Sequence, residues 1–186
     1  LQVLIDLHTA PLSQNGFDNG GISGVCKWAQ NPEEVEFVLT VLERLAKRYG
    51  TRKGLWGIEV INEPVTENMW KTMNVPERYP AVDPELAEGS GPVTLEFLKD
   101  FYKEAYDRIR AYMPEEKYVV IHDGFELKAW KGYMQEEKYK NVVLDTHQYL
   151  MVAESNGCEQ TVEGYTNYIK EHFKKDIQNN PDIEII

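Results

Sequence analysis

The chain has 186 residues, of which 42% are hydrophobic and 27% are charged, with a formal net charge of −11. This composition is typical of a globular domain with a hydrophobic core. The negative charge repels phosphate backbones, so we do not expect a nucleic acid partner. No apolar run is long enough to span a bilayer. The two cysteines, Cys26 and Cys158, fit two free thiols or one disulfide equally well.

Short apolar segments alternate with longer amphipathic ones from the start of the chain. Residues 1–7 are apolar and rich in β-forming side chains, which predicts a buried parallel strand. Residues 32–49 predict a helix, because apolar side chains recur there on one face. Asn31 is its expected N-cap, Pro32 takes its first position, and Gly50 ends it.

The alternation continues to the end of the chain. Further strands are expected at residues 55–61, 118–121, 141–145 and from 183 onward, and further helices at residues 94–112 and 162–178. Residues 65–92 are rich in proline and glycine and predict a long loop, whereas residues 126–139 predict a short helix at most.

Such β–α repeats imply a parallel sheet with right-handed crossovers. A doubly wound sheet and a (β/α)8 barrel both fit this pattern. No Gly-x-Gly-x-x-Gly motif follows a strand, which removes the best sign of a dinucleotide-binding fold.

Polar side chains follow each of the first four expected strands. Their ends are Asp6-Leu7-His8, Asn62-Glu63-Pro64, His122-Asp123 and Asp145-Thr146-His147-Gln148-Tyr149. In parallel sheets, ligands bind at the carboxyl ends of the strands. The two long connections, residues 9–31 and 65–92, also follow strand ends, and such loops often build a site. The sequence therefore predicts a ligand site at this edge of the sheet.

Glycoside hydrolysis is the chemistry that suits this set best. It needs a carboxyl group near the leaving oxygen that gives up a proton and later takes one back. Glu63 fits this role, because it follows a buried strand and Pro64 stiffens the chain after it. Asn62 could hydrogen-bond a sugar hydroxyl. Flat apolar faces near the strand ends are offered by Trp28, Trp70, Trp130 and Tyr149.

Several of these residues also have a structural interpretation. Asn-Glu-Pro by itself is a weak motif, because such combinations are common in turns. His8 could be a hydrogen-bonded core histidine, and His122 and Asp123 could serve the fold alone. Glu59 lies in the middle of a strand and could be the buried partner of a basic group.

Taken together, these motifs resemble glycoside hydrolase family 5 of clan A, and within it the exo-β-1,3-glucanase-like branch. Residues 5–19 are similar to that branch's Asp-Leu-His-Gly-Ala-Pro-Gly-Ser-Gln-Asn-Gly-Phe-Asp-Asn loop, and residues 57–64 to its acid/base strand. Residues 122–125 and 145–149 match its next two strand ends. Thr9 and Leu12 replace glycines of the loop, and residues 150–153 depart from the usual continuation.

The resemblance implies an α/β fold that is a partial (β/α)8 barrel, truncated at both ends. Residues 1–186 would form the central part of a single catalytic domain, from its third strand to the start of its seventh. Glu63 would be the acid/base, and the nucleophile would be a glutamate beyond Ile186, which Glu184 precedes. The implied substrate-binding residues are His8, Asn15, Phe17, Asp18, Asn62, His147 and Tyr149. Of these, His8, His147 and Tyr149 would line the subsite where the bond breaks.

The implied activity is that of a retaining β-glycosidase acting on β-glucans or β-glucosides, of the exo-β-1,3-glucanase or β-glucosidase type. Its two carboxyl groups would stand about 5 Å apart, and the pKa of Glu63 would have to rise in the intact site. The resemblance implies no metal or other cofactor, and an extracellular or cell-surface location. We expect the 186 residues alone not to run this reaction efficiently.

Two other functions fit the strand ends. In a metal-dependent barrel hydrolase, a divalent ion would be ligated by residues from the set His8, His122, Asp123, Asp145 and His147. In a non-catalytic carbohydrate-binding remnant of a barrel, the pocket would bind sugar without cleaving it.

Overall fold

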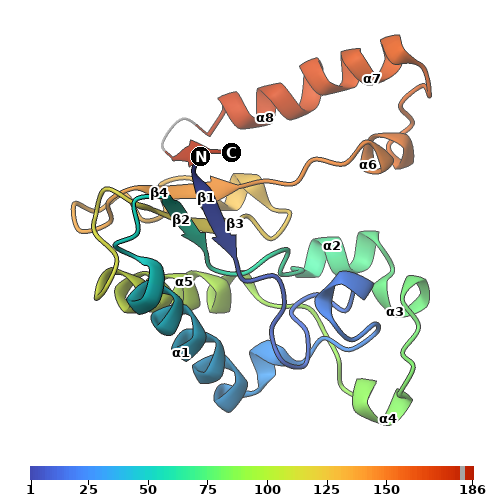
Figure 1. Cartoon of the computed structure of the whole chain (residues 1–186). Helices are drawn as coiled ribbons and strands as arrows, with labels where there is room; N and C mark the ends of the chain where they lie inside the picture. Colours follow the sequence, from blue (N-terminus) through green and yellow to red (C-terminus); the bar gives the residue numbers. More distant parts are fainter. Residues whose placement is uncertain (181–182) are drawn as a thin grey trace.

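The structure is a computed structural model that describes residues 1–180 and 183–186. Five strands form one parallel sheet in the order β1-β2-β3-β4-β5 (Figure 1). They span Val3–Asp6, Leu55–Glu59, Tyr118–His122, Val142–Asp145 and Glu184–Ile185. The strands follow one another in chain order, without the reversal that defines a doubly wound sheet. The predicted α/β class is confirmed, and the arrangement is that of consecutive barrel units.

The strand β1 is less buried than its apolar sequence predicted. It pairs with β2 on one side and is the edge strand of the sheet, and Val3 is 47% exposed. The apolar side chains of an edge strand have fewer neighbours than those of a central strand. The central strand β3, by contrast, buries Val119, Val120 and Ile121 completely.

Two long helices cover one face of the sheet and pack against each other (Figure 1). They are α1 (Pro32–Tyr49) and α5 (Leu95–Arg110), and both agree with the predicted ranges. Asn31 precedes α1 as predicted, but its side chain does not cap the helix. A 3₁₀ turn over Trp28–Gln30 brings the Lys27 carbonyl close, and the Asn31 amide donates to it at 2.6 Å.

Two of the tryptophans proposed to face a sugar are part of the core instead. Trp28 is fully buried, with its ring edge-on to Phe101 at 4.8 Å between centroids. Trp130 is also fully buried, and its indole N–H donates to the Asp123 carbonyl at 2.7 Å. Both side chains belong to the hydrophobic core, so they stabilise the fold and do not line a ligand pocket.

The prediction of a long irregular loop over residues 65–92 was wrong. This segment holds three short helices, α2 (Glu67–Thr72), α3 (Val75–Arg78) and α4 (Pro84–Ala87). Two of its prolines lie in the first turn of a helix, where a missing N–H costs nothing. Asp83 caps α4 by accepting hydrogen bonds from two backbone N–H groups. The segment packs through Val65 and Val75 in a small apolar cluster.

The remaining elements lie between β3 and β5. A 3₁₀ turn at Leu127–Trp130 matches the predicted short helix, and α6 (Leu150–Ser155) was not predicted. The predicted helix over 162–178 is confirmed as a continuous run of α7 (Val162–Tyr168), a π-helical segment (Ile169–Phe173) and α8 (Lys174–Gln178). Cys26 and Cys158 are free thiols. Within the described residues, no helix has both the length and the apolar character needed to cross a membrane.

Candidate active site

Glu63 lies in the segment that follows β2, and its backbone has a strained conformation. Its φ angle is 44°, in the left-handed region that costs a residue with a side chain on the order of 1 kcal/mol or more. The Gln14 side chain holds this turn by donating to the Asn62 carbonyl at 2.7 Å. The Asn62 N–H donates to the Leu7 carbonyl, and the Val65 N–H to that of Gln14. The loop after β1 therefore fixes the strained turn after β2.

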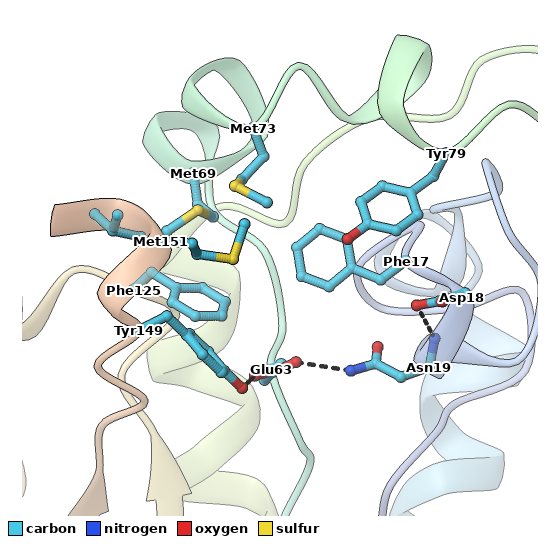
Figure 2. A pocket seen from close by; sticks show the side chains of 11 residues that line it. Phe17, Asp18, Asn19, Glu63, Met69, Met73, Tyr79, Phe125, Tyr149 and Met151 are labelled. Atoms are coloured by element: carbon cyan, nitrogen blue, oxygen red, sulfur yellow. Dashed lines mark hydrogen bonds between the residues drawn. The ribbon is translucent and has the colours of Figure 1, made fainter. Parts of the chain in front are cut away.

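Three donors hold the Glu63 carboxylate, which is almost completely buried. His147 Nδ1 lies 2.7 Å from Oε1, and the Tyr149 hydroxyl donates to the same oxygen at 2.6 Å. The Asn19 side-chain amide donates to Oε2 at 2.8 Å. Figure 2 shows Tyr149 and Asn19 reaching the carboxylate from opposite sides. The carboxylate is thus held in a single orientation by residues from two different loops.

These contacts set the ionisation of Glu63. Burial acts to raise its pKa, but the hydrogen bonds from His147, Tyr149 and Asn19 outweigh burial and lower the pKa to about 2. The carboxyl group is therefore ionised at neutral pH. The rise in pKa expected for an acid catalyst does not occur here, because each of the three groups that hold the carboxylate is a donor.

His147 links Glu63 to a second carboxylate. Its Nε2 lies 3.1 Å from Asp145 Oδ2, while its Nδ1 contacts Glu63. Ionised carboxylates only accept hydrogen bonds, so both ring nitrogens must donate and the imidazole carries a positive charge. In agreement, the hydrogen bonds to Asp145 and Glu63 raise the pKa of His147 to about 10.

A third carboxyl group, that of Glu59, is buried near Asp145. Burial, followed by the negative charges of Asp145 and Asp6, raises the pKa of Glu59 to about 8 and outweighs the attraction of His147. For Asp145, burial opposes ionisation, but the hydrogen bond and charge of His147 outweigh it and lower the pKa. At neutral pH, Glu59 therefore carries a proton and Asp145 does not.

The strand end His122-Asp123 stabilises the loop that follows it. The fully buried His122 accepts the Gly124 N–H on Nδ1 at 3.0 Å, and burial lowers its pKa to about 3. Asp123 accepts the Phe125 N–H and the Thr146 hydroxyl, each at 2.7 Å, and burial raises its pKa to about 6. These contacts favour the structural interpretation of both residues.

One group of side chains within the described residues has the spacing of a metal site. Glu63, His122 and His147 each offer a ligand atom, and these atoms lie within 4.8 Å of one another. Of the five ligands proposed from the sequence, this group contains His122 and His147. Both oxygens of the Glu63 carboxylate already accept hydrogen bonds from side chains.

A pocket of about 170 Å³ opens above the Glu63 carboxylate. Four residues selected from the sequence line it: Glu63, Phe17, Asp18 and Tyr149. The other lining residues are Asn19, Met69, Met73, Tyr79, Phe125, Met151 and Val152. Sequence reasoning assigned no role to these seven. Asn19 and Phe125 had a signal, since both lie in motifs that carry the family resemblance.

The other four selected residues, Asn15, His8, Asn62 and His147, do not line the pocket. Asn15 is fully buried; its Oδ1 accepts the Phe17 N–H at 2.9 Å, and its amide donates to Asn19 Oδ1 at 3.1 Å. It therefore acts on the pocket through its neighbours. His8 has an exposed side chain, 2.7 Å from Asp6, and does not line the pocket. Asn62 is buried, and its backbone holds the Glu63 turn. Substrate contacts by each of the selected residues stay a prediction.

A buried, hydrogen-bonded carboxylate at the carboxyl edge of a parallel sheet is typical of glycoside hydrolases built on (β/α)8 barrels. The family model described as Cellulase (glycosyl hydrolase family 5) matches residues 1–182. The chain therefore belongs to glycosyl hydrolase family 5.

Several curated relatives of the chain are named as glucan 1,3-β-glucosidases. The chain is 37% identical over 151 residues to the probable glucan 1,3-β-glucosidase A of Emericella nidulans, covering 80% of this chain and 30% of the relative. It is 34% identical over 153 residues to the glucan 1,3-β-glucosidase of Schwanniomyces occidentalis, with the same coverage. The chain thus spans about 30% of the length of these relatives.

Solved structures share the fold at low sequence identity. Rutinosidase from Aspergillus niger superposes with a TM-score of 0.65 at 18% identity, covering all of this chain and 48% of that one. A β-glucanase from Saccharophagus degradans gives a TM-score of 0.52 at 14% identity, covering 80% and 36%. These likenesses establish the architecture and nothing about the substrate.

Proposed function

We propose that the protein is a retaining β-glycosidase of the glucan 1,3-β-glucosidase type, with Glu63 as the acid/base. The observation that carries this proposal is the position of Glu63 at the floor of a pocket, oriented by His147, Tyr149 and Asn19. Membership of family 5 and the names of the curated relatives support β-glucans or β-glucosides as substrates. An extracellular or cell-surface location is a further proposal, based on the same resemblance.

In this mechanism Glu63 acts twice. It first donates a proton to the glycosidic oxygen while a second carboxylate attacks the anomeric carbon and forms a glycosyl-enzyme. It then takes a proton from the water that releases the sugar with retained configuration. We assign the nucleophile to a glutamate of the complete protein outside residues 1–186. Within the described residues, Asp145 is already paired with His147, and Glu59 carries a proton.

The role of Glu63 requires its pKa to rise from about 2. A negatively charged nucleophile about 5 Å away would oppose ionisation of Glu63, and a bound sugar would exclude water. Asn62 would contact the sugar's 2-hydroxyl, and His8, His147 and Tyr149 would line the subsite where the bond breaks. Asn15, Phe17 and Asp18 would shape the pocket wall.

The test is the Glu63→Ala variant of the protein expressed from its complete gene, assayed with 2,4-dinitrophenyl β-glucoside. This leaving group needs no protonation, so the glycosyl-enzyme still forms, whereas its hydrolysis slows by about 10²–10⁴-fold without the base. Added azide should restore turnover and yield β-glucosyl azide, because it enters through the space that the carboxylate vacated. The exposed Glu137→Ala serves as the control.

Four results would contradict the proposal. Turnover by Glu63→Ala close to that of the parent would contradict the acid/base role of Glu63. A product with the α configuration would contradict the retaining mechanism. The cluster of Glu63, His122 and His147 supports a metal-dependent hydrolase as a second candidate. Loss of activity on treatment with a chelator, with recovery on adding Zn²⁺, would favour that candidate. Binding of glucoside without any turnover would indicate a carbohydrate-binding remnant.

A further inference from the structure

The pocket above Glu63 has few polar groups. They are Asp18, Asn19, Glu63 and the hydroxyls of Tyr79 and Tyr149, and the remaining lining side chains are aromatic, aliphatic or thioether groups. Sugar rings carry hydroxyl groups around their whole edge, and each one loses free energy when it leaves water without a new partner. Aromatic faces can also pack against a sugar ring, but the methionine and valine side chains offer neither a flat ring nor a strong hydrogen-bond partner, so the wall that they form suits an apolar group better than a sugar ring.

One wall is built largely from methionines. Met69 and Met73 come from α2 and its end, and Met151 from α6, so two separate segments converge on one side of the pocket (Figure 2). Met151 is 37% exposed. Thioether side chains are flexible and polarizable, and they adapt to apolar ligands of varied shape. An exposed apolar lining of this kind is typical of a binding surface.

Aromatic rings complete both walls. Phe125 has a φ angle of 63°, a strained conformation for a bulky residue, and Asp123 holds it by accepting its N–H at 2.7 Å. Its ring lies on the methionine side in Figure 2. On the other side, the rings of Phe17 and Tyr79 pack with centroids 4.9 Å apart. Strain kept at a pocket wall indicates that the orientation of the Phe125 ring has a function.

The position of the pocket relative to Glu63 indicates which part of a substrate it holds. A proton donor in a glycosidase must face the oxygen of the leaving group. The pocket is in direct contact with this carboxylate, and its volume of about 170 Å³ suits a single ring or a short alkyl chain.

We propose that this pocket is a leaving-group site for an apolar aglycone, so that β-glucosides of hydrophobic alcohols or phenols are better substrates than β-linked glucose oligomers. The inference rests on the proposed function, because it takes Glu63 as the proton donor. It assigns specificity to Met69, Met73, Met151 and Phe125, which lie outside the hydrogen-bond network of the carboxylate.

The experiment compares methyl, hexyl and benzyl β-glucosides with laminaribiose, using the protein expressed from its complete gene. Methanol and hexanol are leaving groups of similar acidity, so their kcat/KM ratio reports contacts made by the aglycone. We expect the hexyl and benzyl glucosides to exceed the methyl glucoside in kcat/KM by at least about tenfold. We also expect both to exceed laminaribiose.

Two variants tie this preference to the pocket. Met73→Gln and Met151→Gln keep the length of the side chain and make it polar, so each should lower the hexyl-to-methyl ratio by about threefold or more. Val162 is 85% exposed on α7 and outside the pocket, so Val162→Gln is the matched control and should keep the parent ratio. Circular dichroism checks that each variant is folded. Inhibition by hexyl 1-thio-β-glucoside, which resists hydrolysis, gives a second readout that the same variants should weaken.

The outcomes separate this inference from the proposed function. Equal kcat/KM for methyl and hexyl glucosides, with laminaribiose preferred, would overturn the apolar site and leave the glycosidase intact. A hexyl preference that both methionine variants retain would place the aglycone elsewhere and would also overturn the inference. Failure to hydrolyse any β-glucoside would instead contradict the proposed function.

Discussion

Glu59 at the end of β2 and Glu63 in the turn beyond it are both almost completely buried, yet their pKa values shift in opposite directions. The pKa of Glu59 rises to about 8, and that of Glu63 falls to about 2. Burial acts in the same sense on both. The difference comes from their neighbours, because Glu63 accepts three hydrogen bonds, whereas Glu59 lies near the carboxylates of Asp145 and Asp6. The polarity of the contacts, and not burial, decides which carboxyl group is charged.

His147 lies between the two regions. It donates to Asp145, which neighbours Glu59, and to Glu63 at the pocket floor. The order of charges is therefore neutral Glu59, negative Asp145, positive His147 and negative Glu63. Opposite charges alternate along this chain of contacts, so removing one member should change the ionisation of the others.

The largest change is expected from His147→Gln. The loss of the imidazolium removes a charged hydrogen bond worth about 1.5–3 kcal/mol, so kcat/KM should fall by about 10–100-fold. The pKa of Glu63 should rise from about 2 toward its ordinary value of 4.5, because its strongest donor is gone. The pH profile of kcat/KM measures both effects, because activity is lost on the alkaline side as Glu63 loses its proton; an alkaline limb that does not move would contradict the assignment.

The same variant has a predicted signature in stability. The folded-state pKa of His147 is raised above 6.5, so its contribution is fully present below pH 6.5 and is lost as pH rises toward about 10. The difference in unfolding free energy between parent and variant should therefore shrink over that range. His172 lies in the exposed helical run after β4, so His172→Gln is the control.

A smaller effect is expected from Glu59→Gln. Glu59 has a raised folded-state pKa, so its stabilisation is present below pH 4.5 and is lost as pH rises through about 8. Glutamine does not titrate. The variant should therefore gain about 1–3 kcal/mol relative to the parent between pH 5 and pH 9.

Chemical denaturation at the two pH values measures this gain, with the exposed Glu136→Gln as the control. A difference between parent and variant that stays constant with pH would show that Glu59 does not hold a proton in the folded protein. The contrast between the two glutamates would then disappear.

The smallest effect is expected from Asn19→Ala. This change removes one neutral donor from the Glu63 carboxylate, worth about 1 kcal/mol, so kcat/KM should fall about fivefold. Asn15→Ala should have a similar or smaller effect, since Asn15 reaches Glu63 only through Asn19. Steady-state kinetics of the two single variants and the double variant test this order, and additive losses would show that the two residues act separately.

The sequence indicated the long elements and the floor of the site. Local periodicity and end signals were enough for α1 and α5, because amphipathic helices and buried strands leave a regular apolar pattern. Glu63, Tyr149 and Phe17 were found because they follow strand ends or lie in a recognisable loop motif. Local patterns do not reveal the short helices after β2, because proline is common in loops as well as in the first turn of a helix.

By itself, the sequence determined the α/β alternation and the edge of the sheet that carries the polar residues, and it predicted Glu63 as the acid/base. These features depend on residues close together in the chain. Only the tertiary structure decided that Asn19 and His147, 128 positions apart, hold the same carboxylate. It alone decided that Met73 and Met151 face one pocket, and that Glu59 and Glu63 titrate in opposite directions. Ionisation and pocket polarity depend on contacts between distant segments, which no local pattern records.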